Sequence, residues 1–410
     1  MIFQFSLYGF LKNQRYFEPF FILFLLEKGL SFTQIGILVG FREISVGILE
    51  IPTGAVADLS GRRRSMVFSF LAYIFSFLLF TFSSSYAGFF PAMALFATGE
   101  SFRTGTHKAM IFTWLRRNNR ISERSRVYGY TRSWSKIGSA VSIPISALLV
   151  MFFNGYAVLF LFTLIPYTAA LINFLFYPRE LEGEGSGRSM PGLLIRHLTA
   201  VLKKSLQRPR LRRLLIESMG FEGVFKAALD YLQPVLQQLA LALPFLICME
   251  ASRRSAVVVG IVYVLLYLGA AAASRNAYRF NRWSGGEENA ARSLWRLAAF
   301  FYVALIPLLL FKWYPVSVVF FMGLFLVQNI WRPLLISRFD AYASETEGAT
   351  VLSIESQGKS LATMLTAPLM GIAVDVLKGV RSIGPFWPVA LIGALVSLTM
   401  LYGLKERMQA

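Results

Sequence analysis

The chain consists of long runs of hydrophobic residues separated by short polar connections. Most runs are about 18 to 25 residues long, the length that an α-helix needs to cross roughly 30 Å of hydrocarbon. The pattern therefore predicts an all-α polytopic membrane protein with twelve transmembrane helices. The predicted helices are 3–26, 32–57, 64–83, 88–116, 127–152, 155–177, 212–243, 255–280, 292–311, 316–339, 349–376 and 384–404.

One long polar stretch, residues 178–213, divides these helices into two sets of six. It contains a Gly- and Glu-rich segment and then a basic segment, which we expect to lie along the membrane surface. We predict an amino-terminal six-helix bundle over residues 1–180 and a cytoplasmic linker over 181–211. A carboxy-terminal six-helix bundle is expected over residues 212–410, with a central cavity between the two bundles.

The charge of the connections predicts the orientation of the chain. Basic residues concentrate in the connections after the second, fourth, sixth and eighth helices, whereas residues 83–87 and 153–155 carry no charge. Cytoplasmic loops of membrane proteins are enriched in Lys and Arg, so both termini are expected to be cytoplasmic. Arg253 and Arg254 are the one local exception.

Composition supports the same class of protein and excludes others. Of the 410 residues 56% are hydrophobic and only 15% are charged, which is unusual for a soluble protein of this length. The net charge of +19 would suggest nucleic acid in a soluble protein, but here the basic residues lie in the connections, so no nucleic-acid partner is predicted. A single cysteine excludes an intrachain disulfide, and two distant histidines give no His/Cys metal cluster. We predict no metal and no cofactor.

The two halves of the chain share short strings in the same order. Residues 16–19 (Tyr-Phe-Glu-Pro) match residues 231–234 (Tyr-Leu-Gln-Pro), and residues 122–123 and 344–345 are both Ser-Glu. Together these matches indicate a duplicated six-helix unit, a pattern found in transporters.

Charged residues inside the predicted helices are the main functional signal. Each costs about 2.5–3.5 kcal/mol at the centre of a transmembrane helix, so they are expected to line a polar cavity rather than face lipid. Three groups are each expected to share one helical face: Lys12, Arg15, Tyr16 and Pro19; Glu100, Arg103 and His107; and Glu222, Lys226 and Asp230.

Arg132 and Lys136 differ from the other in-span charges, because two like charges on one helical face have no local partner. They require carboxylates from another helix or an anionic substrate. Glu355 and Lys359 instead have the order and spacing of an intrahelical ion pair. Inward cations outnumber inward acids by nine to five, which favours an anionic solute. The predicted substrate-binding residues are Arg15, Tyr16, Arg103, Arg132, Lys136, Lys226, Arg332 and Lys359.

Proton coupling requires a group that gains and loses a proton near neutral pH. Burial in a low-dielectric cavity favours the protonated form of a carboxylate, and histidine titrates in the right range. The candidates are Glu18, Glu100, Glu222, Asp230, Glu355 and His107. A hydrogen-bonded structural role is the alternative for His107, and a structural ion pair is the alternative for each carboxylate.

The segment between the second and third helices resembles a signature of the major facilitator superfamily. That signature is Gly-x-x-x-Asp-Arg-x-Gly-Arg-Arg/Lys, and Gly54, Asp58, Gly61, Arg62 and Arg63 match it in what we expect to be a short loop over residues 54–64. The resemblance extends over essentially the whole chain, and residues 50–53 and 99–109 are similar to a bacterial branch of the family.

The resemblance implies the major facilitator fold and a location in the bacterial inner (plasma) membrane. It implies that the five matching residues form a gating loop that latches the cytoplasmic side, with Leu59, in place of the usual arginine, weakening the latch. The antiporter signature of the fifth helix is incomplete: Gly138 is present, but Ser142 replaces a glycine and Pro144 is displaced. This argues against drug/proton antiport without excluding it.

Together these features predict a secondary active transporter that works by alternating access, is coupled to protons and carries a small organic anion. Its expected partners are the substrate, the proton and membrane lipids, and a monomer is expected. Proton-coupled efflux of amphipathic drugs and lipid flipping on the same fold remain alternatives. An enzyme is not expected, because no Walker A, His-Glu-x-x-His or Gly-x-Ser-x-Gly motif is present.

Overall fold

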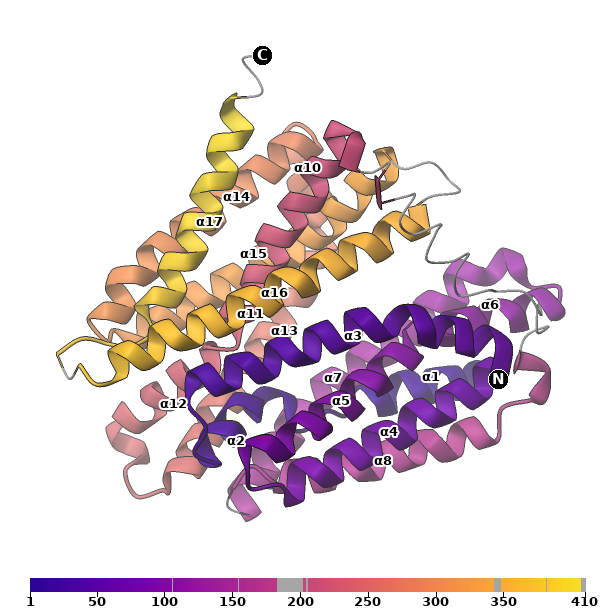
Figure 1. Cartoon of the computed structure of the whole chain (residues 1–410), viewed down its shortest axis with the longest axis horizontal. Helices are drawn as coiled ribbons and strands as arrows, with labels where there is room; N and C mark the ends of the chain where they lie inside the picture. The colour runs from indigo at the N-terminus through magenta and orange to yellow at the C-terminus, as the bar shows by residue number, and fades with distance from the viewer. Residues whose placement is uncertain are drawn as a thin grey trace. The chain divides into compact units, whose positions relative to one another are not determined.

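The computed structural model describes residues 1–104, 106–153, 155–182, 202–203, 206–342, 348–380 and 382–406. Every regular element in these ranges is helical, and no strand occurs in them, which confirms the all-α prediction. The chain divides into two compact units (Figure 1). Unit 1 contains residues 1–28 and 41–196, and unit 2 contains residues 29–40 and 197–410. The boundary at residue 196 falls within the predicted linker, most of which lies outside the described residues.

Unit 1 is built around three pairs of packed helices. Helix α4 packs against α5 and α8, and α1 packs against α7 (Figure 1). Stacked aromatic rings fill its core: Phe160 stacks on Phe17 and Phe80 with ring centroids 4.9 and 5.0 Å apart. Its elements are α1 (Ile2–Lys12), η1 (Glu18–Phe20), α2 (Phe21–Glu27), the later part of α3 (Phe32–Ser60), α4 (Arg62–Phe82), α5 (Tyr86–Arg103), α6 (Thr106–Arg117), η2 (Ile121–Glu123), α7 (Arg124–Phe153), α8 (Val158–Leu175) and η3 (Arg179–Glu182).

Unit 2 has an aromatic core and a buried ion network. Trp331 stacks on Phe221 with ring centroids 4.4 Å apart. The Arg338 side chain, only 2% exposed, contacts Glu217 at 2.7 Å and Glu288 at 2.9 Å, so it joins three helices. The elements are α10 (Pro209–Ser218), the π-helical turn η4 (Met219–Gly223), α11 (Val224–Leu229), α12 (Leu232–Ala242), η5 (Pro244–Leu246), α13 (Ala251–Trp283), α14 (Glu287–Leu310), α15 (Tyr314–Tyr342), α16 (Gly348–Lys378) and α17 (Trp387–Glu406).

The first turns of α3 belong to unit 2 because they pack closely on α16. The backbone N–H groups of Phe32 and Thr33 donate to the Asp375 carboxylate at 3.1 and 2.7 Å. A Cβ at Gly36 would lie 2.4 Å from the Ala367 carbonyl oxygen, so only glycine permits this approach. One boundary between the units, at residues 40 and 41, therefore falls inside the continuous helix α3, whereas the sequence predicted a division only at the linker.

Within the described residues, eight helices are long and apolar enough to cross a membrane, judged by length and composition. These eight are α3, α4, α7, α8 and α13–α16. The structure thus supports a polytopic helical membrane protein but gives fewer long helices than the twelve predicted. Three of the predicted helices are broken.

The expected continuous helices 3–26 and 212–243 are wrong because each is interrupted in its middle. Proline lacks an N–H and its ring clashes with the carbonyl four residues earlier, which for Pro19 is Arg15 and for Pro234 is Asp230. Residues 13–17 and 230–231 are accordingly outside any helix. Each proline then lies in the first turn of the next helix, where no N–H is needed. The matched strings 16–19 and 231–234 thus each begin where a predicted helix is interrupted.

The expected continuous helix 88–116 is also wrong. Helix α5 ends at Arg103, Thr104 has an extended backbone (ψ 124°), and α6 begins at Thr106. The groups expected to share one face in the first, fourth and seventh helices are therefore distributed over broken segments.

The expected loop over residues 54–64 is much shorter in the structure. Helix α3 continues through Gly54 and Asp58 to Ser60, and α4 begins at Arg62. Gly61 alone makes the turn, with φ 99°, a left-handed conformation that favours glycine. No proline or glycine lies between Gly54 and Gly61. The helix therefore continues to Ser60, and the chain reverses direction at Gly61.

Helices α1 and α7 cross at close range because both carry a glycine at the contact. A Cβ at Gly9 would lie 2.8 Å from Ser135 Oγ, and a Cβ at Gly138 would lie 2.5 Å from the carbonyl oxygen of Phe10. The Gln14 side-chain amide donates to the Gly138 carbonyl at 3.1 Å. This crossing brings the polar faces of the two helices together.

Gly138→Ala is expected to destabilise the folded protein by about 1–3 kcal/mol, the usual effect of overpacking a close contact. Gly129→Ala on the same helix is the matched control, since nothing lies within 4 Å of a Cβ there. The control should be neutral or gain up to about 1 kcal/mol from helix propensity. Denaturant titration of the purified protein in detergent measures both. Equal stability of the two variants would contradict the close crossing.

Candidate functional site

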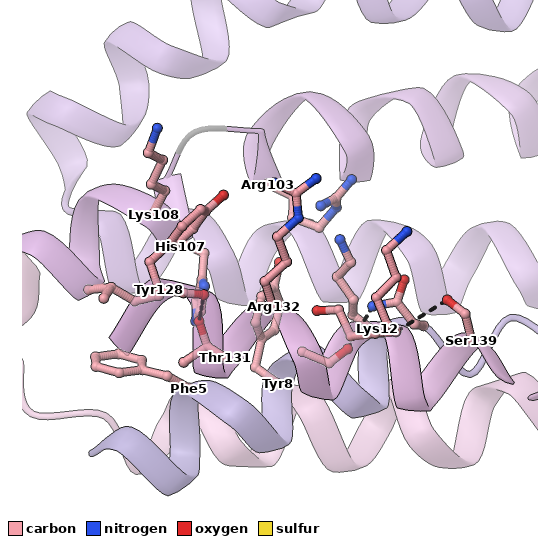
Figure 2. Close-up of a pocket in the computed structure, with 15 residues that line it drawn as sticks. Phe5, Tyr8, Lys12, Arg103, His107, Lys108, Tyr128, Thr131, Arg132 and Ser139 are labelled. Carbon is pink, nitrogen blue, oxygen red and sulfur yellow. Dashed lines mark hydrogen bonds between the residues drawn. The ribbon is translucent and has the colours of Figure 1, made fainter. Parts of the chain in front are cut away.

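Unit 1 contains a cavity of about 360 Å³ between α1, α5, α6 and α7 (Figure 2). All of its 15 lining residues belong to unit 1. Helix α1 contributes Phe5, Tyr8, Gly9 and Lys12, which have the i, i+3, i+4, i+7 spacing of one helical face. Helix α7 contributes a second such face with Thr131, Arg132, Ser135, Lys136 and Ser139. The close crossing at Gly9 brings these two faces next to each other at the cavity.

The cavity is strongly basic. Five cations line it (Lys12, Arg103, Lys108, Arg132 and Lys136), and no Asp or Glu is among its lining residues. Within the described part of the chain, Lys12, Arg132 and Lys136 form no ion pair. Like charges about 6 Å apart, the separation of residues i and i+4 on a helix, repel by about 0.7 kcal/mol in water and about 3 kcal/mol at an effective dielectric constant of 20. Lys12, Arg132 and Lys136 therefore bring positive charge to the cavity that no ion pair among the described residues compensates.

Lys108 is positioned by aromatic rings at one end of this cavity. Its ammonium lies 5.6 Å from the ring centroids of both Phe112 and Tyr128. Cation–π contacts of this kind hold the charge without neutralising it. Lys108 therefore adds to the positive field of the cavity.

Glu100 lies behind the cavity wall and binds two arginines. It accepts hydrogen bonds from Arg15, from Arg103 Nη2 at 2.5 Å and from the Tyr73 hydroxyl at 2.7 Å. Arg15 Nε also donates to the Tyr167 hydroxyl at 3.0 Å. Both carboxylate oxygens of Glu100 are thus occupied, and the guanidinium of Arg103 is fixed at the wall of the cavity.

His107 is packed among aromatic rings. Its ring centroid lies 3.8 Å from that of Tyr8 and 5.5 Å from that of Phe5. Its Nε2 lies 3.4 Å from the Tyr177 hydroxyl, which donates to the Gln4 carbonyl at 3.2 Å. These contacts agree with the structural alternative for His107, and its role in proton coupling stays a prediction.

A second charged cluster lies in unit 2, where acids and bases balance. Arg332 Nη1 lies 2.7 Å from Glu355 Oε1 and 3.4 Å from Glu222 Oε2. Lys359 Nζ lies 3.3 Å from Glu355 Oε1 and 3.5 Å from Glu222 Oε2. Ser218 also donates to Glu355. Two carboxylates therefore neutralise two cations, and the intrahelical pair of Glu355 and Lys359 that the spacing predicted is present.

Glu222 differs from Glu355 in this cluster. Its side chain is 10% exposed, and its Oε1 is buried without a hydrogen-bond partner in the described part of the chain. It lies in the π-helical turn η4, a local distortion often found at functional sites.

The predicted substrate-binding residues are distributed over both units. Arg103, Arg132 and Lys136 line the cavity of unit 1, and Arg15 lies behind it on Glu100. Arg332 and Lys359 belong to the cluster of unit 2. Tyr16 is half-buried in the break after α1, and Lys226 is exposed on α11. Of the remaining proton-coupling candidates, Glu18 is exposed at the start of η1 and Asp230 ends α11.

The sequence prediction missed several residues of the cavity. Lys12 and Lys108 were counted among the inward-facing cations but were not assigned to the substrate site, although both line the cavity. The hydroxyl residues Thr131, Ser135 and Ser139 were missed as well. Their spacing follows Arg132 and Lys136 along α7, and this polar face could have been read from the sequence.

The residues of the expected gating loop hold unit 1 together on one side. Arg62 Nη1 donates to Thr113 Oγ1 at 2.9 Å. Arg63 donates to the carbonyls of Phe174 and Leu175, at 3.1 and 2.7 Å, where α8 ends. The side chains of residues 58–60 lie outside the described part of the chain, so the latch expected for Asp58 stays a prediction.

Comparison with known proteins places this geometry in a family. Residues 5–354 match the model of the Major Facilitator Superfamily. A segment of 101 residues is 32% identical to an uncharacterized MFS-type transporter, YxaM, of Bacillus subtilis (strain 168). This segment spans 25% of the chain and 24% of that relative.

Solved transporters share the fold over nearly the whole chain. The nucleoside transporter NupG superposes with a TM-score of 0.77 at 13% identity, covering 100% of this chain and 99% of that one. A peptide transporter of the POT family, solved in complex with sulfate, superposes with a TM-score of 0.68 at 11% identity, covering 98% and 93%. At these identities the likeness shows the fold alone. With the family match over residues 5–354, it leads to one conclusion: the chain belongs to the major facilitator superfamily.

Proposed function

We propose that the protein is a secondary active transporter that carries a small organic anion across the membrane by alternating access. Its family makes it a membrane transport protein rather than an enzyme, as the sequence predicted. The observation that carries the proposal is the cavity of unit 1, which five cations and no carboxylate line. An anion would compensate this charge, whereas a cation would be repelled and a neutral amphipathic drug would leave it uncompensated.

We further propose that twelve segments cross the membrane. The eight long apolar helices would supply eight crossings and α17 a ninth. The broken pairs α1/α2, α5/α6 and α10/α12 would supply the other three. Non-helical backbone is tolerated at membrane depth where it lines a cavity, and discontinuous helices form the binding sites of many transporters. The proposed location is the bacterial inner membrane, with both termini in the cytoplasm.

The carboxylate that we propose for proton coupling is Glu222. Its Oε1 has no partner in the described part of the chain, whereas both oxygens of Glu100 accept hydrogen bonds. A proton on Glu222 would weaken its attraction to Arg332 and Lys359, which lie on two different helices. Gain and loss of a proton would therefore alter how α15 and α16 are held at η4.

Uptake by purified protein in proteoliposomes tests the proposed function. A panel of radiolabelled organic anions would be offered with and without a pH gradient, beside a cationic drug and a fluorescent lipid. We expect saturable uptake of at least one anion and a change in its rate when the gradient is imposed. Transport of the drug or the lipid with no transport of any anion would overturn the proposal in favour of efflux or flipping.

A further inference from the structure

We propose that the substrate carries two separated anionic groups, as in a dicarboxylate or a phosphorylated carboxylic acid. This inference rests on the proposed function and narrows it, because a transporter of organic anions could equally select solutes with a single charge. The observations that favour two charges are the number of cations at the cavity of unit 1 and their spread along it.

The charge at the cavity exceeds what one anionic group can compensate. The five lining cations and Arg15 behind them face one bound carboxylate, that of Glu100, which leaves five positive charges. Glu18 also interacts electrostatically with Lys12 and Arg15 and lowers the excess to four. A monoanion would leave most of this excess in place, and each further negative charge on the solute would remove more of it.

The cations are spread along the cavity instead of gathering at one point. Figure 2 shows Lys108 toward one end, Arg103 and Arg132 in the middle, and Lys12 near Ser139 toward the other end. One carboxylate or phosphate reaches only one of these positions. A solute with two separated anionic groups would contact the cations at two of these three positions at the same time.

The surface between the cations suits the neutral part of such a solute. Thr131 and Ser135 bring hydroxyl groups to the cavity, and the buried rings of Phe5 and Tyr8 form the apolar part of its wall. Arginine binds carboxylates and phosphates through two parallel hydrogen bonds, so Arg132 fits either type of end group. Arg103 already donates to Glu100 and to the Tyr73 hydroxyl, so it contributes mainly its charge. A volume of about 360 Å³ is at the small end of ligand sites, which indicates a compact solute.

Matched pairs of solutes that differ by one anionic group test the inference. Binding of succinate is compared with that of succinamate, and binding of 3-phosphoglycerate with that of glycerate, by calorimetry on the purified full-length protein in nanodiscs. Glycerol 3-phosphate, whose charge sits in one group, separates total charge from separated charge. We expect the solutes with two anionic groups to bind at least about tenfold tighter than their single-charge partners, the effect of one added charge-assisted contact.

Variants at the two ends of the cavity localise the effect. Lys12→Gln and Lys108→Gln should each reduce the preference for the second charge, whereas Arg279→Gln on α13 of unit 2 should not, because Arg279 is no part of this cavity. Equal affinity within each matched pair would overturn the inference and leave anion transport intact. A preference that no end variant changes would overturn it too. Failure to bind or transport any anion would overturn the proposed function itself.

Discussion

Arg132→Gln is expected to lower uptake of the transported anion by at least about tenfold while the protein stays folded, since a charge-assisted hydrogen bond to the substrate is lost. Arg132 is exposed in the cavity and forms no ion pair in the described part of the chain, so its removal leaves no buried carboxylate without a partner. Initial uptake rates in proteoliposomes, at matched protein incorporation, measure the effect.

Arg126→Gln is the matched control for this prediction. Arg126 is exposed on the same helix and is not part of the cavity, so its variant removes the same charge without the contact. We expect its uptake rate to stay near that of the wild type. Lys in place of Arg132 keeps the charge but not the two parallel hydrogen bonds, and should give an intermediate rate. Wild-type uptake by Arg132→Gln would place the anion elsewhere.

Arg132 and Lys136 line a cavity, as their spacing led us to expect, while their role in substrate binding stays a prediction. Two like charges on one helical face cannot satisfy one another, so the expectation that they face a cavity needed no knowledge of other helices. Arg332 is the opposite case. Its neutralisation by Glu355 and Glu222 depends on the packing of α15, α16 and η4, which no spacing along the chain reveals. The burial of Arg338 between Glu217 and Glu288 could not be predicted from the sequence for the same reason.

The helix breaks show another limit of the hydrophobic pattern. Residues on both sides of each break are apolar, so a window of about 20 residues reads one continuous span. The signals at Pro19 and Pro234 were local, and proline inside a transmembrane helix does not always break it: Pro144 and Pro166 lie inside continuous α7 and α8. Hydropathy thus located the apolar helices but not the breaks beside which Lys12, Arg15 and Arg103 lie.

The two units differ in how their charges are compensated. In unit 1 the cavity holds more cations than the described acids can neutralise, whereas the cluster of unit 2 is balanced by Glu222 and Glu355. An uncompensated cavity is suited to bind an anion. A balanced cluster is suited to respond to a proton, because protonation of one acid leaves one cation unpaired. This asymmetry is the basis for the proposal that unit 1 binds the anion and that unit 2 couples its transport to protons.

Glu222→Gln is expected to abolish the response of anion uptake to a pH gradient while exchange of the anion across the membrane continues. Glutamine has nearly the same shape but cannot gain or lose a proton, so the cluster with Arg332 and Lys359 would stay in one state. The loss of folded stability should be modest, because the Oε2 contacts of Glu222 are long, 3.4 and 3.5 Å. Uptake rates with and without the gradient, and counterflow without it, measure the two activities.

Glu100→Gln is the matched control. It should lose stability and anion uptake but keep the response of uptake to the pH gradient. Because Glu100 holds Arg15 and Arg103 together, its neutralisation removes the partner of two largely buried cations, which costs about 3–5 kcal/mol in comparable buried pairs. We expect a lower midpoint of thermal unfolding and weaker anion uptake, with the ratio of the rates measured with and without the pH gradient unchanged. If Glu222→Gln keeps that ratio and Glu100→Gln loses it, the proton is carried in unit 1, and the division of roles between the two units is wrong.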